Sequence, residues 1–510
     1  MCCHEMNRRQ FIGLTAAGVA GAGLVASDAE AQSFQGEQWD PQIPFKRWGK
    51  PLRVQPVLLY NTHKPRAQTS WRPWGGLHSQ DDVAEEMNRI GKELSDVKKR
   101  ADFPLQMYPV VKVQNKEQAT AVASKSDHDV MLVYAASGGG DALEACYAGS
   151  SNNLMFVRHR SGPVYLWYEI AHCRFLRKGG DAFQVDEYRD PAGMDVHDVV
   201  VDDTRELMWK LRAIHGKENF VGKKIITLGG ASGWCCPQAP LVGKEKFALE
   251  MINVPYEIMA RRIQAARNDK KLVSQCKQEA TRYLDILDTE LETERPFVEN
   301  AFLLYHLFKQ LMTENDADAF TINHCMGTIM PMAETTACLT LSLLNDEGYM
   351  AFCESDFNVI PSGLLLYHIA GKPVFLNDPT YPHHGCVTCA HCTAPRRMDA
   401  ENYAPARIMT HFESDYGATP KVNLPKGTQV TMVCPDAGQK TWVGFTGKIV
   451  ESPFYDICRS QYDIEIDGNW RKLLQDMRGF HWNMVLGDYS REMDYACRKL
   501  KIEWNNISAV

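Results

Sequence analysis

The chain has 510 residues and a net charge of -7, with 45% hydrophobic and 23% charged residues. This length predicts two to four domains, and the composition is that of a globular protein rather than a fibrous or disordered one. The acidic balance, without a polybasic run, argues against nucleic acid and anionic membranes as partners. A neutral polar ligand such as a sugar fits this charge better.

The N-terminus has the pattern of a twin-arginine export signal. Residues 6–11 (MNRRQF) contain the arginine pair, residues 11–25 are uncharged and apolar, and residues 29–31 (AEA) fit a small-x-small cleavage site. The apolar stretch is shorter than the ~20 residues that span a membrane. We expect residues 1–31 to be removed and the mature protein to be periplasmic or extracellular, without a membrane anchor. The alternative is a cytosolic tail with a chance arginine pair.

Residues 50–201 alternate between apolar runs and amphipathic stretches, which argues for a parallel α/β sheet. The charged stretch at 81–99 has helical periodicity. The expected strands are Val54–Tyr60, Asp129–Ala136, Asn153–Arg158 and Pro163–Tyr168.

Residues 202–370 repeat this alternation and predict a second Rossmann-like domain. A helix is expected from Asp202 or Asp203 to Gly216, where glycine is a favoured helix end. Further helices are expected at 244–268, 270–292 and 296–313, and strands at Lys224–Leu228 and Ala319–Asn323.

Two glycine-rich turns follow expected strands, at Ser137–Asp141 and Gly229–Gly233. Neither has the spacing of a dinucleotide-binding turn or the lysine of a phosphate-binding loop. We interpret both as tight turns at the carboxyl edge of a sheet. Because α/β proteins bind ligands at such edges, a substrate contact from Ser137–Asp141 remains open.

Residues 371–510 predict a mostly antiparallel, barrel-like β domain with a short helix at about 489–500. The overall fold class expected is therefore α/β, with two Rossmann-like parallel-sheet domains followed by this β-rich domain. The expected strands are Arg407–Glu413, Gln429–Val433, Thr441–Val450 and Tyr462–Ile466.

The densest set of candidate metal ligands lies between residues 350 and 400. Glu354 follows the apolar Met350–Phe352, Asp378 follows the strand-like Lys372–Leu376, and His391 comes shortly after. Carboxylates at two element ends with an imidazole nearby suit a hard divalent cation. The alternative is that these acidic residues lie at strand ends without binding anything.

Four segments resemble the metal-site region of the L-fucose isomerase and L-arabinose isomerase superfamily. They are Ala351–Asp356, Gly371–Phe375 with Asp378, Ala390–Pro395 and Phe480–Trp482. The resemblance is specific over about 40% of the chain, in its C-terminal part, and elsewhere rests on the α/β order.

The resemblance implies a Mn²⁺-type site with Glu354, Asp378, His391 and His481 as ligands. It also implies an aldose–ketose isomerase that works through an enediol, with Glu354 and Asp378 as acid and base. Members of this superfamily form trimers or hexamers, so we expect a homo-oligomer. Because the predicted export signal is unusual for a sugar isomerase, two alternatives remain open. The protein could catalyse another reaction on a saccharide, such as epimerisation, elimination or glycoside cleavage, or it could be a non-catalytic sugar-binding protein.

Several other motifs have more than one interpretation. The run Cys386-x-x-Cys389-x-x-Cys392 fits a zinc or iron–sulfur ligand set, a disulfide or plain thiols. Three further motifs also have two interpretations. In the simpler one they are packing or loop residues, and in the other they are metal ligands, a disulfide or substrate contacts. They are Cys235 with Cys236, His383 with His384, and Trp74-Gly75-Gly76 with His78.

Overall fold

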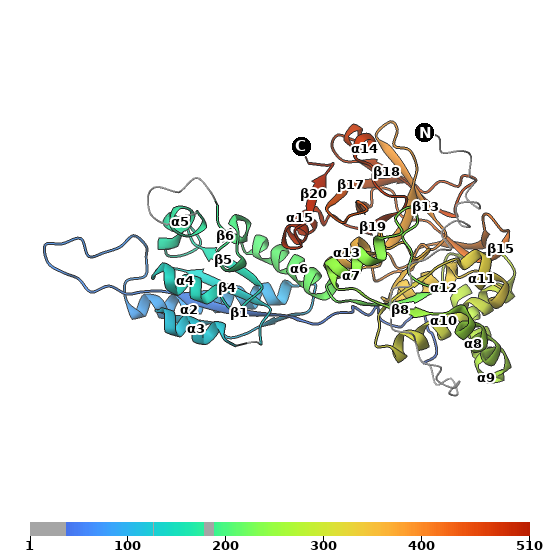
Figure 1. The fold of residues 1–510 in the computed structure, drawn as a ribbon, viewed down its shortest axis with the longest axis horizontal. Helices are drawn as coiled ribbons and strands as arrows, with labels where there is room; N and C mark the ends of the chain where they lie inside the picture. Colours follow the sequence, from blue (N-terminus) through green and yellow to red (C-terminus); the bar gives the residue numbers. More distant parts are fainter. Residues whose placement is uncertain (1–36, 126, 178–187, 510) are drawn as a thin grey trace. The chain divides into compact units, whose positions relative to one another are not determined.

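The computed structural model describes residues 37–125, 127–177 and 188–509 (Figure 1). Its contacts divide the chain into two compact units. The inserted unit is Gly49–Glu218, and the main unit joins the segment up to Trp48 with Asn219–Val510. The predicted export signal at 1–31 lies outside the described residues. Within the described residues, no helix is long and apolar enough to cross a bilayer.

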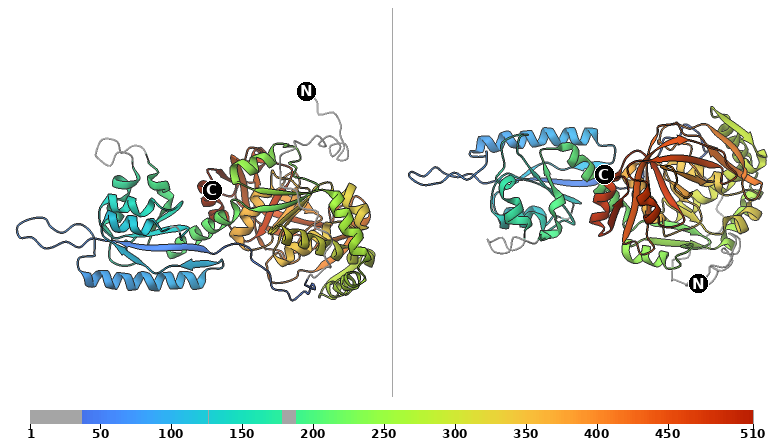
Figure 2. Two further views of the ribbon diagram at one scale, coloured as in Figure 1. Left: turned by 60° about the horizontal axis from the view of Figure 1, so that its bottom comes forward. Right: turned by 90° about the horizontal axis from the view of Figure 1, so that it is seen from above.

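The inserted unit is a parallel sheet in the order β2-β1-β4-β5-β6, with β3 also paired to β1. Helix α2 covers one face, and α4 and α5 cover the other (Figure 2). The strands are β1 (Leu52–Leu59), β2 (Leu105–Met107), β3 (Val111–Val113), β4 (Val130–Ala135), β5 (Asn152–Val157) and β6 (Val199–Val201). The helices are α2 (Gln80–Arg100), α3 (Lys116–Ala123), α4 (Gly140–Tyr147), α5 (Leu166–Ala171) and α6 (Thr204–Phe220).

The expected strand at Pro163–Tyr168 is wrong, because α5 begins at Leu166. The cause is Tyr165, which is fully buried and whose hydroxyl donates to Glu86 Oε1 at 2.6 Å. The apolar residues on either side of Tyr165 therefore lie in a loop and in α5, and they do not form a strand of the sheet.

The main unit contains a second parallel sheet, in the order β11-β10-β7-β8. Its strands are β7 (Lys224–Leu228), β8 (Glu250–Val254), β10 (Ala319–Ile322) and β11 (Met350–Phe352). The helices between and after them are α7 (Ala239–Phe247), α8 (Tyr256–Asn268), α9 (Lys270–Leu284), α10 (Arg295–Glu314), α11 (Cys325–Ala333), α12 (Cys338–Glu347) and α13 (Ile360–Ala370).

Two helices expected here are too long. The stretch 244–268 contains β8, because Ala248 turns the chain with a left-handed φ of 55° and Pro255 caps the next helix. The stretch 270–292 ends its helix at Leu284 and continues into β9 (Thr289–Glu292), which pairs with β14 (Ala406–His411). Strand β15 (Tyr416–Val422) completes this small sheet.

The C-terminal region is a closed antiparallel barrel of six strands in the order β16-β19-β12-β13-β18-β17, closed by the pairing of β16 with β17. The predicted fold class is confirmed: α/β with two parallel sheets, followed by a barrel. The strands are β12 (Phe375–Pro379), β13 (Cys386–His391), β16 (Gln429–Pro435), β17 (Thr441–Glu451), β18 (Ser460–Ile466) and β19 (Trp482–Leu486). Strand β20 (Glu503–Asn506) extends β17, and the helices are α14 (Arg471–Asp476) and α15 (Ser490–Lys499).

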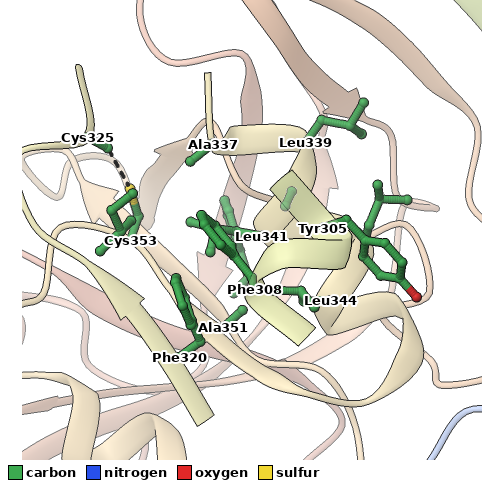
Figure 3. Close-up of a cluster of buried hydrophobic side chains, with 14 of the residues drawn as sticks. Tyr305, Phe308, Phe320, Cys325, Ala337, Leu339, Leu341, Leu344, Ala351 and Cys353 are labelled. Carbon is green, nitrogen blue, oxygen red and sulfur yellow. Dashed lines mark hydrogen bonds between the residues drawn. The ribbon is translucent and has the colours of Figure 1, made fainter. Parts of the chain in front are cut away.

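One hydrophobic core joins the second parallel sheet to the barrel, with Ile226 of β7 and Trp482 of β19 in the same buried cluster. Phe308 stacks on Phe320 within it, at a ring-centroid distance of 4.3 Å (Figure 3). The segments 202–370 and 371–510, expected as separate domains, therefore pack into a common body from Asn219 onward.

Candidate metal centre

Glu354 lies at the carboxyl end of β11, in a turn that a neighbouring loop holds in place. Glu354 and Ser355 have φ values of 63° and 52°, and two consecutive non-glycine residues in this region are costly. The glycine-rich turn after β7 stabilises them: Ser232 N donates to Ser355 O at 3.1 Å, and Ser355 Oγ donates to Gly230 O at 2.8 Å. The turn predicted as a plain strand-to-helix connection thus fixes the backbone that carries Glu354.

Strand pairing in the barrel brings the other candidate ligands together. Asp378 is on β12, which lies between β13 and β19. It pairs with Ala390, the residue before His391, while its neighbour Asn377 pairs with Trp482, the residue after His481. The antiparallel register therefore puts His481 in line with Asp378 and His391 one residue further along the neighbouring strand.

The four residues predicted as metal ligands come together. His481 Nε2 lies 3.3 Å from Glu354 Oε2 and 3.3 Å from Asp378 Oδ1. His391 Nε2 lies 3.7 Å from Glu354 Oε1. One ligand atom each from Asp378, His391 and His481 lies within 4.8 Å of the others. Because ligands on one cation are separated by such distances, these side chains form a group that could hold a metal ion.

The converging atoms are buried and several of them have no hydrogen-bond partner within the described part of the chain, so a cation could take the place of the missing partner. His481 is 0% exposed and His391 is 3% exposed. Among the described residues, no hydrogen bond of good geometry reaches Glu354 Oε2, His391 Nε2 or His481 Nε2. Buried polar atoms without such bonds are costly, which is why they mark sites for an ion.

The charges of the group are balanced by the imidazoles. Burial raises the pKa of Glu354, but the neighbouring His391 and His481 lower it by more. The pKa of Glu354 therefore lies below its usual range. Burial lowers the pKa of His481, but the neighbouring carboxylates of Asp356 and Glu354 raise it by more. The pKa of His481 therefore lies well above its usual range. The carboxylates and the imidazoles thus favour each other's charged forms, and a cation would favour the charged carboxylates in the same way.

Asp356 contacts this group and was not assigned to it by the sequence reasoning. Its Oδ2 lies 2.8 Å from His481 Nδ1, and its side chain is 2% exposed. A carboxylate on one ring nitrogen orients the other toward a metal. Asp356 is inside the segment that resembles the isomerases, two residues after Glu354, and that short spacing was the available signal.

A cavity of about 150 Å³ opens beside Glu354 and His391. Trp234 lines it, with its ring edge-on to His481 at 5.0 Å and stacked on Phe480 at 4.7 Å. Thiols make up much of the remaining wall. The lining residues are Ser232, Trp234, Asn323, His324, Cys325, Met326, Gly327, Cys338, Cys353, Glu354, His391, Cys392, His411, Glu413 and Cys458.

The cysteine run does not form one ligand set. Cys389 is in the main core cluster, whereas Cys392 packs with Cys338 and Cys458 in a separate cluster. Cys386 is only partly buried. Every cysteine in the described part of the chain is a free thiol, including Cys235 and Cys236, so the disulfide alternatives are not found there.

Other candidates are not part of this group. His383 and His384 are in the turn between β12 and β13 and belong to none of the convergent groups of described residues. In the inserted unit, Ser137 Oγ accepts from Asn61 N at 2.7 Å, and Trp74 stacks on Tyr168 at 6.3 Å. These residues have structural contacts within their own unit.

A further group, Cys276 with Glu279 and His306, has a structural explanation. Glu279 is 0% exposed, and its Oε1 accepts from Trp39 N at 2.7 Å while its Oε2 lies 2.6 Å from His306 Nε2. Glu279 therefore anchors the segment before Trp48 rather than facing a cavity.

No protein-family model matches the chain, and no curated protein matches it. The site is therefore interpreted from its own geometry.

Proposed function

We propose that this protein is a divalent-metal-dependent sugar enzyme, an aldose–ketose isomerase related to the L-fucose and L-arabinose isomerases. The observation that supports the proposal is the convergence of three residues from distant segments: Glu354 and Asp378 each lie 3.3 Å from His481 Nε2, and Glu354 lines a cavity. Two carboxylates with imidazoles suit Mn²⁺ or a similar divalent cation. Glu354, Asp378, His391 and His481 would hold it.

The chain's own residues have distinct tasks in this proposal. A bound cation supplies Lewis-acid polarisation of two adjacent sugar oxygens. Glu354, just after β11, and Asp378, on β12, move protons at the two carbons: one carboxylate takes a proton from one carbon as base, and the other, in its protonated form, gives a proton to the neighbouring carbon as acid. Asp356 holds His481 in orientation, and the largely apolar cavity wall keeps bulk water from the reacting carbons.

The decisive experiment is a sugar-panel assay in D₂O with Mn²⁺. We expect deuterium at C1 or C2 of the substrate and its product, with a loss on the order of 100- to 10,000-fold in Glu354→Gln. The matched control is Glu465→Gln, an exposed carboxylate on β18 of the same barrel. It should keep full activity.

The same assay separates the alternatives. New reducing ends or an unsaturated product without an isomer would replace the isomerase by a hydrolase or lyase. A sugar-dependent rise in the melting temperature without turnover would replace it by a binding protein.

The proposal also places the protein outside the cytoplasm and in a trimer or hexamer. Cell fractionation with N-terminal sequencing tests export and cleavage before Gln32. Light scattering of the purified protein tests assembly, and a monomer at the concentrations used for activity would contradict it.

A further inference from the structure

A buried histidine lines the cavity beside Glu354 and has no part in the proposed metal site. Five thiols and the thioether of Met326 form much of the wall, and a thiol is a weak hydrogen-bond donor and acceptor. His411 also lines the cavity and is 7% exposed. His411 is therefore the strong hydrogen-bonding group placed deepest in the wall outside the metal group. The more exposed polar side chains of the wall are Ser232, Trp234, Asn323, His324 and Glu413.

An irregularity in β14 turns His411 toward the buried side of its strand. In a regular strand alternate residues share a face, so Ala406, Ile408 and Thr410 would be buried together. Ala406 and Ile408 are buried, but the next buried residue is His411 rather than Thr410. The pairing of β14 with β15 shifts its register between Met409 and His411. Such a bulge re-aims a side chain, and here it re-aims the imidazole.

Neighbouring segments hold the turn that carries His411. Arg459 Nε donates to Thr410 O at 2.8 Å, and its Nη2 donates to Thr410 Oγ1 at 3.2 Å. On the other arm of the turn, Gly417 has a φ of 77°, and a Cβ there would lie 2.5 Å from Thr336 N. The backbone around His411 is thus fixed before a ligand arrives, as a group that orients a substrate requires.

The ring of His411 is oriented by Ser414, whose Oγ lies 3.4 Å from Nδ1. With Nδ1 directed to the turn, Nε2 is the ring nitrogen that can meet a ligand in the cavity. A neutral imidazole that accepts at Nδ1 carries its proton on Nε2. His411 is therefore arranged as a hydrogen-bond donor to an oxygen atom in the cavity.

We propose that His411 is a substrate-binding residue whose Nε2 donates to a sugar hydroxyl beyond the two reacting carbons. His411 belongs to none of the groups of described residues that could hold a metal ion, so it meets a different part of the sugar from the oxygens on the cation. This inference rests on the proposed function, because it assigns a contact to the far end of that substrate. It also makes His411 a determinant of specificity, since a site built to hydrogen-bond a substrate hydroxyl rejects an analogue that lacks it.

The test is calorimetric titration of the Mn²⁺-loaded full-length protein with a panel of aldopentoses and aldohexoses. Asparagine keeps a polar group near the place of Nδ1, whereas glutamine keeps one near the place of Nε2. We therefore expect His411→Asn to weaken binding of the preferred sugar by about three- to tenfold, the effect of one hydrogen bond, and His411→Gln to keep most of the affinity. The matched control is His384→Asn, at an exposed histidine of the same unit, and it should bind as the parent does.

Deoxy analogues of the preferred sugar identify the hydroxyl. For the analogue that lacks the hydroxyl bound by His411, the parent and His411→Asn should bind equally, whereas the other analogues should keep the difference. A loss of equal size for every analogue, or a parallel loss of Mn²⁺ affinity, would show a structural role and overturn the proposal. Unchanged binding in His411→Asn, or no sugar binding by the parent, would overturn it as well.

A measurement on the parent protein covers variants that fold poorly. Bound sugar should protect His411 from diethyl pyrocarbonate, as mapped by mass spectrometry, while His384 stays reactive. Equal labelling of His411 with and without sugar would contradict the contact. Sugar binding that depends on His411 but gives no deuterium exchange would disprove the isomerase and support this contact, so the two failures are distinct.

Discussion

Asp356 Oδ2 lies 2.8 Å from His481 Nδ1, while Nε2 of the same ring lies 3.3 Å from both Glu354 and Asp378. The carboxylate thus fixes which ring nitrogen faces the candidate ligands. Its second oxygen accepts from Asn358 N at 3.0 Å, which holds the carboxylate itself.

Replacement of Asp356 by Asn should weaken divalent-metal affinity by about 10- to 100-fold, because His481 loses the charge that orients it. Competition with a metal-sensitive chelator measures this. The matched control is Asp463→Asn, a barrel carboxylate hydrogen-bonded by Thr388 Oγ1 at 2.5 Å. Equal affinities in Asp356→Asn and the parent would rule out the orienting role.

Metal removal should lower stability. Addition of Mn²⁺ to chelator-treated protein, at 100 times its dissociation constant, stabilises the folded state by about 2.7 kcal/mol if the unfolded chain does not bind it. A thermal melt detects the shift. Glu354→Gln and Asp378→Asn should lose this Mn²⁺-dependent rise in melting temperature. A rise of equal size in either variant would show that the metal binds at another site.

Gly363 of α13 packs closely against Phe352 of β11 and Asn483 of β19, the strands next to Glu354 and His481. A Cβ there would lie 2.5 Å from Phe352 Cε1 and 3.0 Å from Asn483 Nδ2. Gly363→Ala should therefore cost about 1–3 kcal/mol in unfolding free energy, and weaken metal binding by shifting β11 or β19. Urea unfolding measures the first effect. Gly327→Ala, with open space around its position, is the control, and a similar loss in both would contradict the packing argument.

Asp346 predicts a pH-dependent stability. Burial raises its pKa to about 7, although Arg397 and Arg396 oppose the shift. Because the folded-state pKa is above the unfolded one, this carboxyl destabilises the protein progressively as pH rises from about 4 to 7. Asp346→Asn should match the parent near pH 4 and gain up to about 4 kcal/mol at pH 8. Melting temperatures across this range test it, and a difference that does not grow with pH would refute it.

The sequence predicted the barrel, both parallel sheets and the four candidate ligands, but for different reasons. Apolar strands such as β4 and β7 are visible in the sequence because they are buried on both faces. The ligand set came from resemblance, since nothing local in the sequence shows that β12 lies between β13 and β19. Local reasoning failed where tertiary contacts decide, as at Tyr165 and at Ala248.

The thiol cluster illustrates the same limit. Cys392 attracted attention within its run of cysteines, yet its partners, Cys338 and Cys458, come from distant segments. A sequence motif shows neighbours along the chain, whereas strand register and the start of α12 determined these partners.

The segment before Trp48 has a consequence for how the protein is made. Trp39 is fully buried against Tyr283 and Phe302, and Lys46 N donates to Glu347 O at 2.9 Å. During synthesis this segment is translated before the inserted unit, but the surface it packs on is translated only after the whole inserted unit. The inserted unit can therefore complete its sheet on the ribosome, whereas the body that holds the candidate metal centre closes only after the barrel strands have been translated.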